Sequence, residues 1–340
     1  MLPCCHKALC ATLAVLAIGV ALAIAPPLRW IVGPVILEPG PEGSFDSVAV
    51  KDPSIVRYDG RWHLFYTARD PENYTLGYAS AESLETVGQA KRYPLRQLRS
   101  GNSPYAAAPQ VFYFRPQRKW YLVFQTTGAN YQPVYSTSSD VSQPASWTPP
   151  LPLLPKTDDA KWIDFWIICD EKKAYLFFTR NHRDVVVMST RLADFPQGFG
   201  DAKTVLSPVH EAVHVYALPG AKPGYVMLFE QQEGDLRHFG LASAPALGGP
   251  WTVTNPRFAS PEQLEYRGGK GQGSKPQRHW TDEVSHGEFL RAGYDERLII
   301  PADNWEFLIQ GLPRERHQGA YPLLPWSVGI IRSEAPHTLE

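Results

Sequence analysis

The sequence predicts an all-β protein folded as a five-bladed β-propeller. The main observation is a recurring hairpin pattern: a polar or acidic residue opens an apolar strand, a tight turn follows, and an aromatic strand returns. The copies begin 47 to 75 residues apart, and repeats of this size with about four strands each are typical of propeller blades. The five copies begin near Asp52, Gln110, Asp164, Glu211 and His286.

Strand signals fill the chain from residue 45 to residue 333. Short runs rich in Val, Ile, Tyr, Phe and Trp alternate with turn residues such as Asp59-Gly60, which is the pattern of strands joined by tight turns. No sustained amphipathic helical pattern competes with it. A third strand is expected in each repeat, at residues 76–80, 134–138, 185–190, 238–243 and 328–332, and Trp147 and Trp251 mark two of the fourth strands.

The N-terminal segment, residues 1–25, has the form of a secretory signal peptide. Lys7 precedes an apolar run that ends in Ala23-Ile24-Ala25, a small-x-small cleavage site. The run is nearly long enough to span a bilayer, so an uncleaved membrane anchor that leaves the domain facing outside is the alternative. We expect a secreted, extracellular protein that touches a membrane only if the segment is uncleaved.

The rest of the chain divides into a linker, one domain and a tail. Residues 26–44 are rich in Pro and Gly and predict a linker. Residues 45–333 form the propeller, and residues 334–340 form a short C-terminal tail. Three of the 4 cysteines lie within the first ten residues, so the mature chain keeps only Cys169. We therefore expect no intrachain disulfide and no cysteine metal site, and we interpret Cys169 as an inert buried thiol.

Charge indicates the class of partner. Lys+Arg 33 against Asp+Glu 34 gives a net charge of -1, which argues against a nucleic-acid-binding protein and favours a neutral partner. The Gly-rich residues 267–271 precede no helix, and the basic residues 275–279 lack interleaved aromatics. We interpret both as solvated loops rather than phosphate sites. We expect a monomer with no organic cofactor.

Three carboxylates indicate the chemistry. In a propeller the first strand of each blade lines the central channel, so the residues that open the five repeats should meet at one face. Asp52, Asp164 or Glu211 alone could be a turn residue, a loop cap or a solvated edge. Together at one opening they repel one another, and a structural purpose is hard to supply. A carboxyl pair in a sugar-sized pocket suits glycoside hydrolysis, with a third carboxylate that raises the pKa of the acid.

The chain also resembles glycoside hydrolase family 62, the α-L-arabinofuranosidases. The resemblance extends over all five repeats, from about Phe45 to Arg332. The segments that carry it are Lys51–Val56, Ala108–Tyr113, Lys119–Leu122, Tyr135–Asp140, Ile163–Asp170, Glu211–Tyr216, Trp280–Glu288 and Leu323–Pro325. The resemblance implies an inverting hydrolase that releases single arabinofuranosyl side groups from the 2- or 3-hydroxyl of xylose in arabinoxylan, and so debranches xylan.

The resemblance also implies roles for individual residues. Asp52 would be the general base, Glu211 the general acid, and Asp164 the residue that tunes and orients the acid. His286 would accompany a structural calcium ion in the central channel, and a hydrogen-bonded core imidazole is the alternative. Contacts with the sugar are expected from Lys51, Gln125, Trp166 and Tyr321.

Some positions depart from the family pattern. Val209-His210 stands where an aromatic residue is usual, Ala217 where a lysine is common, and Pro322 where a polar residue is expected. Residues 302–303 lack a cysteine that many relatives carry. These changes put the contacts with the xylan backbone in doubt. Two alternatives therefore stay open: a catalytically silent carbohydrate-binding propeller, and a related furanosidase that acts on arabinan or another polysaccharide.

Overall fold

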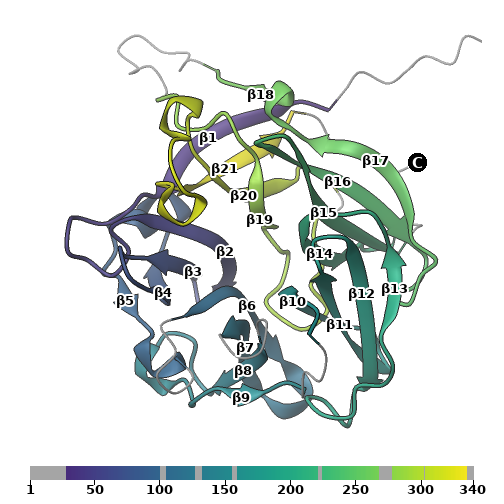
Figure 1. The fold of residues 1–340 in the computed structure, drawn as a ribbon. Coiled ribbons are helices and arrows are strands. Elements are labelled where there is room, and N and C mark those ends of the chain that lie inside the picture. The colour runs from purple at the N-terminus through teal and green to yellow at the C-terminus, as the bar shows by residue number, and fades with distance from the viewer. Residues whose placement is uncertain are drawn as a thin grey trace, which may run out of the picture.

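Five β-sheets are arranged as blades around a central axis (Figure 1), which confirms the predicted all-β five-bladed propeller. The computed structural model describes residues 28–99, 105–126, 132–154, 159–220, 224–267, 278–301 and 303–334. The predicted signal or anchor segment, most of the basic and Gly-rich insertion, and nearly all of the C-terminal tail lie outside these ranges. No helix within them is long and apolar enough to cross a membrane.

The first four blades each contain four antiparallel strands that follow one another in sequence, from the axis outward. Blade 1 contains β2 (Ala49–Tyr58), β3 (Arg61–Arg69), β4 (Tyr74–Ala81) and β5 (Tyr93–Pro94). Blade 2 contains β6 (Ala106–Phe114), β7 (Lys119–Thr126), β8 (Gln132–Ser138) and β9 (Leu151–Pro152). Blade 3 contains β10 (Trp162–Cys169), β11 (Lys173–Arg180), β12 (Asp184–Arg191) and β13 (Lys203–Leu206). Blade 4 contains β14 (Glu211–Ala217), β15 (Tyr225–Glu233), β16 (Leu236–Ala244) and β17 (Thr252–Ala259).

The described helices are short 3-10 turns between strands. They are η1 (Leu84–Gln89), η2 (Arg96–Leu98), η3 (Arg115–Gln117), η4 (Pro144–Ser146), η5 (Pro261–Gln263), η6 (Arg314–Arg316) and η7 (Tyr321–Leu323). The last of these brings Tyr321 to the rim of the central opening. Cys169 is buried and carries a free thiol, as expected.

Blade 5 closes the ring with the N-terminal strand. Its order from the axis is β19 (Ser285–Phe289), β20 (Glu306–Gly311), β21 (Ser327–Ser333), β1 (Trp30–Leu37) and β18 (Leu264–Glu265). The predicted linker is therefore wrong for the residues of β1, which pair antiparallel with β21. The register of this pair shifts between Val32 and Val35, so Gly33-Pro34 occupies an irregularity, where a strand tolerates proline.

Each innermost strand contains a β-bulge that shapes the central opening. The pairing of the first and second strands skips residues in all five blades. In four blades a residue at the bulge has a left-handed backbone: Asp52 (φ 46°), Ala108 (φ 51°), Asp164 (φ 59°) and Ala212 (φ 50°). A bulge bends the strand and re-aims a side chain, and Asp tolerates this conformation better than most residues.

The bulges also change which residues are equivalent. By register, the counterparts of Asp52 and Asp164 are Ala108, Ala212 and His286. Glu211 therefore lies one residue before the position expected for it, and Gln110 lies two residues after. The prediction that Gln110 joins the others is wrong: its buried amide bonds both the N–H and the carbonyl of Ile167, each at 2.7 Å, and so ties blade 2 to blade 3.

Adjacent blades are joined by what we call junction hydrogen bonds. A side chain on the second strand of one blade accepts a hydrogen bond from the bulge N–H of the next blade. The four pairs are Gln310 with Asp52 (3.0 Å), Thr67 with Ala108 (2.8 Å), Gln125 with Asp164 (3.0 Å) and Glu230 with His286 (2.8 Å).

The junction between blades 3 and 4 is different. Thr179 occupies the equivalent position opposite Ile163, but its buried Oγ1 has no hydrogen-bond partner among the described residues. The N–H of Ala212 instead donates to Oδ2 of Asp164 at 2.9 Å. One of the predicted catalytic carboxylates thus replaces a structural acceptor at this junction.

Candidate active site

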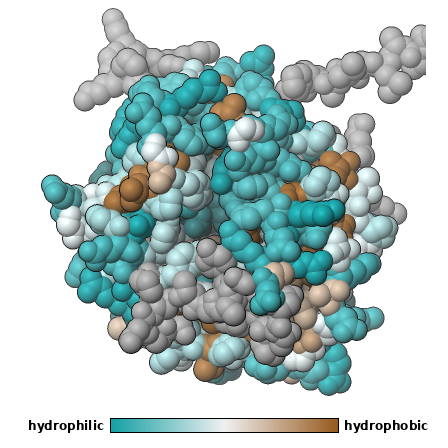
Figure 2. Space-filling view, in the orientation of Figure 1, coloured by the Kyte–Doolittle hydropathy of each residue, from teal (hydrophilic) through white to brown (hydrophobic). Residues whose placement is uncertain are grey.

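A polar pocket of about 360 Å³ opens at the central axis. Figure 2 shows this face hollowed near its middle, with mostly hydrophilic residues around the hollow. Its polar lining comprises Lys51, Asp52, Tyr74, Tyr105, Gln125, Lys161, Asp164, His182, Glu211, His286 and Tyr321. The structure therefore brings together all three predicted carboxylates with His286 and three of the four predicted sugar contacts.

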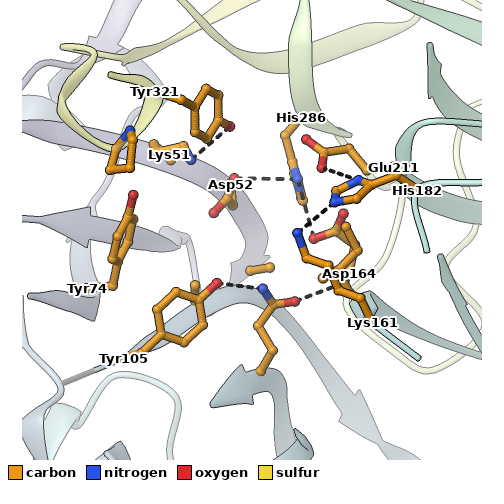
Figure 3. A pocket seen from close by; sticks show the side chains of 15 residues that line it. Lys51, Asp52, Tyr74, Tyr105, Lys161, Asp164, His182, Glu211, His286 and Tyr321 are labelled. Atoms are coloured by element: carbon orange, nitrogen blue, oxygen red, sulfur yellow. Dashed lines mark hydrogen bonds and ion pairs between the residues drawn. The ribbon is translucent and has the colours of Figure 1, made fainter. Parts of the chain in front are cut away.

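His286 lies among the carboxylates. Its Nδ1 is 3.4 Å from Oδ1 of Asp52 and 3.9 Å from Oδ1 of Asp164. Figure 3 shows Asp52 on one side of the imidazole and Asp164 and Glu211 on the other. Burial opposes a charge on the ring, but Asp52 and Asp164 outweigh it and raise the pKa of His286. An imidazolium here offsets part of the repulsion among the carboxylates.

Asp164 is a carboxyl group that holds its proton more strongly than usual. Burial raises its pKa to about 6, helped by the charges of Glu211 and Asp52 and opposed by His286. One oxygen accepts the Ala212 N–H, and the other faces His286. Asp164 thus has a fixed orientation and stands beside the backbone of Glu211.

Glu211 contacts a cation that the sequence analysis missed. The guanidinium of Arg237, on β16, donates to Oε1 of Glu211 and also contacts Glu230. Burial alone would raise the pKa of Glu211, but Arg237, with help from His182 and His210, holds it well below its usual range. The expectation that neighbouring carboxylates raise the pKa of the acid is therefore wrong for the unliganded site, because the ion pair outweighs their repulsion.

Two histidines and a lysine complete the surroundings of Glu211. Nδ1 of His182 lies 3.3 Å from Oε2 of Glu211, and Nε2 of His210 lies 3.8 Å from the same oxygen. The two imidazoles stack, with ring centroids 4.9 Å apart. The Lys161 ammonium lies 2.7 Å from Nε2 of His182 (Figure 3).

The family described as Glycosyl hydrolase family 62 matches residues 40–332. The chain belongs to this family. It is 35% identical over 320 residues to alpha-L-arabinofuranosidase C of Cellvibrio japonicus (strain Ueda107), which aligns with 90% of this chain. The match covers 47% of that relative, so the chain spans about half the length of the curated protein it matches.

Solved structures of the family superpose over nearly the whole propeller. The catalytic domain of the Coprinopsis cinerea GH62 α-L-arabinofuranosidase has a TM-score of 0.80 and 32% identity, and the match covers 91% of this chain and 98% of that one. The Podospora anserina α-L-arabinofuranosidase in complex with cellotriose has a TM-score of 0.80, 30% identity and the same coverages. A GH62 hydrolase in complex with xylotriose has a TM-score of 0.78 and 28% identity, with coverages of 89% and 97%.

One wall of this family 62 pocket is built from Lys51 and tyrosines. Nζ of Lys51 donates to the Tyr321 hydroxyl at 3.0 Å and lies 4.4 Å from the centre of that ring. Tyr321 is 38% exposed, so it presents ring surface at the rim. The rings of Tyr74 and Tyr105 pack against each other, with their centroids 5.3 Å apart. Neither residue opens a repeat, so the repeat pattern did not predict either of them as a site residue.

Gln125 and Trp166 differ from their expected roles. Gln125 lines the pocket, yet both ends of its amide are used: Oε1 accepts from Asp164 N, and Nε2 donates to Tyr105 at 2.7 Å. Trp166 does not line the pocket, so the prediction of a sugar contact is wrong for it. Its ring is 1% exposed and stacks on His214, and its Nε1 donates to Val215 O at 2.8 Å.

The residues around His286 fit a calcium ion poorly. Calcium takes six to eight oxygen ligands as a rule. Among the described residues, Asp52 and Asp164 are the ones whose carboxylate oxygens lie within 4 Å of Nδ1 of His286, and both belong to the proposed chemistry. Waters or carbonyls would have to supply the rest, so we assign no step to a metal.

Proposed function

We propose that this chain is an inverting α-L-arabinofuranosidase that removes single arabinofuranosyl groups from arabinoxylan. The observation that carries the proposal is the meeting of Asp52, Asp164 and Glu211 in one small polar pocket. The family relatives support it: three of them are named arabinofuranosidases, and two solved structures are complexes with cellotriose and xylotriose.

The pocket suits one terminal sugar rather than a length of polymer. Its volume of about 360 Å³ admits a single furanose, and sites for small ligands commonly measure about 300–1,000 Å³. The ring surfaces of Tyr74 and Tyr321 can pack on the apolar face of a sugar. Lys51 can donate to a sugar hydroxyl, since an ammonium has three donors and the Tyr321 hydroxyl uses one.

Asp52 acts as the general base in this proposal. Its carboxylate lies on the His286 side of the pocket and is 7% exposed, so a water beside it has few competing contacts. In an inverting reaction the base deprotonates a water on the face of the sugar opposite the departing oxygen. The bulge and the Gln310 junction hydrogen bond hold this carboxylate in place.

Glu211 acts as the general acid, and its ion pair with Arg237 controls whether it holds the proton that it must donate. In the unliganded site the ion pair keeps Glu211 ionised. A group that donates a proton must first hold one, so the bound substrate has to weaken this contact. Closing the pocket over a neutral sugar acts in that direction, because the loss of water disfavours a carboxylate. Asp164 fixes the peptide of Glu211 through the Ala212 N–H.

The first experiment is incubation of the purified protein with arabinoxylan, arabinan and xylan, with detection of free arabinose. Release from arabinoxylan alone supports the proposal. Release from arabinan alone supports the related furanosidase, which the altered rim residue Pro322 keeps open. Binding without any release supports the catalytically silent propeller. Retention of three mutually repelling carboxylates favours an enzyme, since a binding site has no use for the repulsion.

A pair of variants separates the acid from the base. Glu211→Gln should lose about 10²- to 10⁴-fold in activity on arabinoxylan, the range attributed to a positioned proton donor. It should retain far more on a nitrophenyl arabinofuranoside, whose leaving group departs without a proton. Asp52→Asn should lose activity on both, because water attacks in every turnover. Glu233→Gln is the control, since that side chain is 65% exposed. Equal losses of Glu211→Gln on both substrates would exclude it as the acid.

Location, assembly and metal content belong to the same proposal. We infer extracellular action as a monomer, with the N-terminal segment either cleaved or retained as an anchor. Mass spectrometry of the protein recovered from the medium and from the membrane fraction distinguishes cleavage from retention, and light scattering measures the assembly state. Calcium near His286 remains a prediction. Exhaustive chelation that leaves both the melting temperature and the activity unchanged would remove it.

A further inference from the structure

His182, His210 and Glu211 form a cluster with the spacing of a metal site. The candidate ligand atoms are Nδ1 of His182, Nε2 of His210 and Oε2 of Glu211, and all three lie within 4.8 Å of one another. Within the described ranges, no other group of three or more His, Cys, Asp or Glu residues has this spacing. The histidines come from different places, the turn after β11 and the residue before β14.

The spacing is close to that of a four-coordinate divalent transition ion. Zinc binds imidazole nitrogen and carboxylate oxygen at about 2.0–2.2 Å, so neighbouring ligand atoms of a tetrahedron lie about 3.4 Å apart. The two measured separations from Glu211 Oε2 are 3.3 and 3.8 Å. Only a small movement of the side chains would complete the site. His182 and Glu211 line the pocket, which leaves the fourth position open toward it.

We infer that His182, His210 and Glu211 bind a divalent transition-metal ion such as Zn²⁺, and that the bound ion inhibits the enzyme by occupying the carboxylate of Glu211. The inhibition rests on the proposed role of Glu211, whereas the binding does not. The ion is a ligand at this site and not a participant in the hydrolysis.

Two of the three ligands, His210 and Glu211, can offer a lone pair to an ion without rearrangement. Burial lowers the pKa of His210, with Arg237 adding to the effect, so its ring is neutral at pH 7. Arg237 contacts Oε1 of Glu211, which leaves Oε2 for an ion. The Lys161 ammonium lies 2.7 Å from the far nitrogen of His182.

Lys161 predicts a signature of binding. An ammonium is only a donor, so it leaves the imidazole proton on Nδ1 of His182. An ion at Nδ1 must displace that proton, which moves to Nε2 as the Lys161 ammonium turns away from that nitrogen. The bound imidazole therefore stays neutral, and binding breaks the hydrogen bond between Lys161 and His182. Lys161→Met should bind Zn²⁺ more tightly than the parent, because it removes both the competing hydrogen bond and a positive charge.

Calorimetric titration of the full chain with Zn²⁺ tests the site. The parent should show a binding event that His210→Gln and His182→Gln both lack. His279→Gln is the matched control. Nε2 of His279 lies 2.7 Å from Oδ1 of Asp282, and this surface pair is not part of the pocket lining. The His279→Gln variant should therefore titrate like the parent. Thiols in residues 1–10 can also take up zinc, so the difference between variants is the measurement. Identical isotherms for the parent and His210→Gln would overturn the site.

Inhibition is measured separately on arabinoxylan, with each variant normalised to its own zinc-free rate. Zn²⁺ should inhibit the parent. The His210→Gln variant should need a Zn²⁺ concentration at least about tenfold higher for the same inhibition, since loss of even an outer contact costs a metal site about 10- to 100-fold in affinity. Binding without inhibition would overturn the inhibitory mechanism and count against Glu211 as the acid. Absence of the binding event would overturn the site and leave the proposed function untouched.

Discussion

Gln310→Leu tests whether the junction hydrogen bonds position the catalytic groups. Gln310 is fully buried and does not line the pocket. Its Oε1 accepts the N–H of Asp52 at 3.0 Å, and its Nε2 donates to Ser285 at 3.1 Å. Leucine keeps much of the volume but removes both bonds. Any loss of activity must then pass through the positions of Asp52 and of Ser285, which adjoins His286, and not through contact with the sugar.

The structure gives the expected size of the effect. An unsatisfied N–H of Asp52 should lower the free energy of unfolding by about 1–3 kcal/mol. Asp52 also holds a left-handed backbone, φ 46°, a conformation that costs on the order of 1–3 kcal/mol and relaxes when its restraints are removed. A displacement of the carboxylate by about 1 Å should lower kcat by about 10²-fold. KM should change little, because the pocket wall is intact.

Thr67→Val is the matched control. Thr67 makes the equivalent junction hydrogen bond to Ala108 N at 2.8 Å, and Ala108 carries no functional group. The two variants should lose similar stability in urea unfolding, whereas only Gln310→Leu should lose kcat on arabinoxylan and on a nitrophenyl arabinofuranoside. Equal kcat values for the two variants would refute the positioning role.

Two further predictions address the ring closure and Asp164. Trp30→Ala should lower the free energy of unfolding by about 3–5 kcal/mol, because the ring is fully buried and its Nε1 donates to Phe258 O at 2.9 Å. Val253→Ala is the control, at a position 41% exposed. Equal melting temperatures for the two variants would show that β1 does not close the ring. Asp164→Asn should abolish activity yet raise the free energy of unfolding at pH 8 by about 1–3 kcal/mol. Burial raises the pKa of Asp164 from 3.8 to about 6, so its ionisation opposes folding as the pH rises through 6. The gain should vanish below about pH 4, where both states of the parent are protonated, and a gain independent of pH would contradict this reasoning.

The repeat pattern was enough to predict the blades because each hairpin is local. Its apolar strand, turn and aromatic return are adjacent in sequence, and five copies leave little choice of architecture. The same pattern brought Asp52, Asp164 and His286 together, since the first strand of each blade lies at the axis. β1 was missed because Gly33-Pro34 interrupts its alternation, and because its partner β21 is the last of the described strands and lies far from it in sequence.

Side-chain direction near the bulges could not be predicted. A bulge adds a residue to one strand, which reverses the inward and outward alternation beyond it. Trp166 follows the bulge in β10 and therefore packs behind the pocket, although it is two residues from Asp164. Arg237 and His182 were missed for another reason. Arg237 lies on the third strand of its blade, and His182 lies in the turn after β11. The repeat pattern alone does not show whether side chains at these positions reach the axis.

Asp164 links the architecture to the chemistry. At the other four junctions a side chain with no proposed catalytic role holds the bulge N–H of the next blade. At the fourth blade Asp164 does so, and the N–H that it holds belongs to Ala212, whose peptide bond joins it to Glu211. A movement of Asp164 therefore moves the backbone of the proposed acid, while its other oxygen faces His286 and, through it, Asp52. One buried carboxyl group of blade 3 thereby couples the proposed base, on blade 1, to the proposed acid, on blade 4.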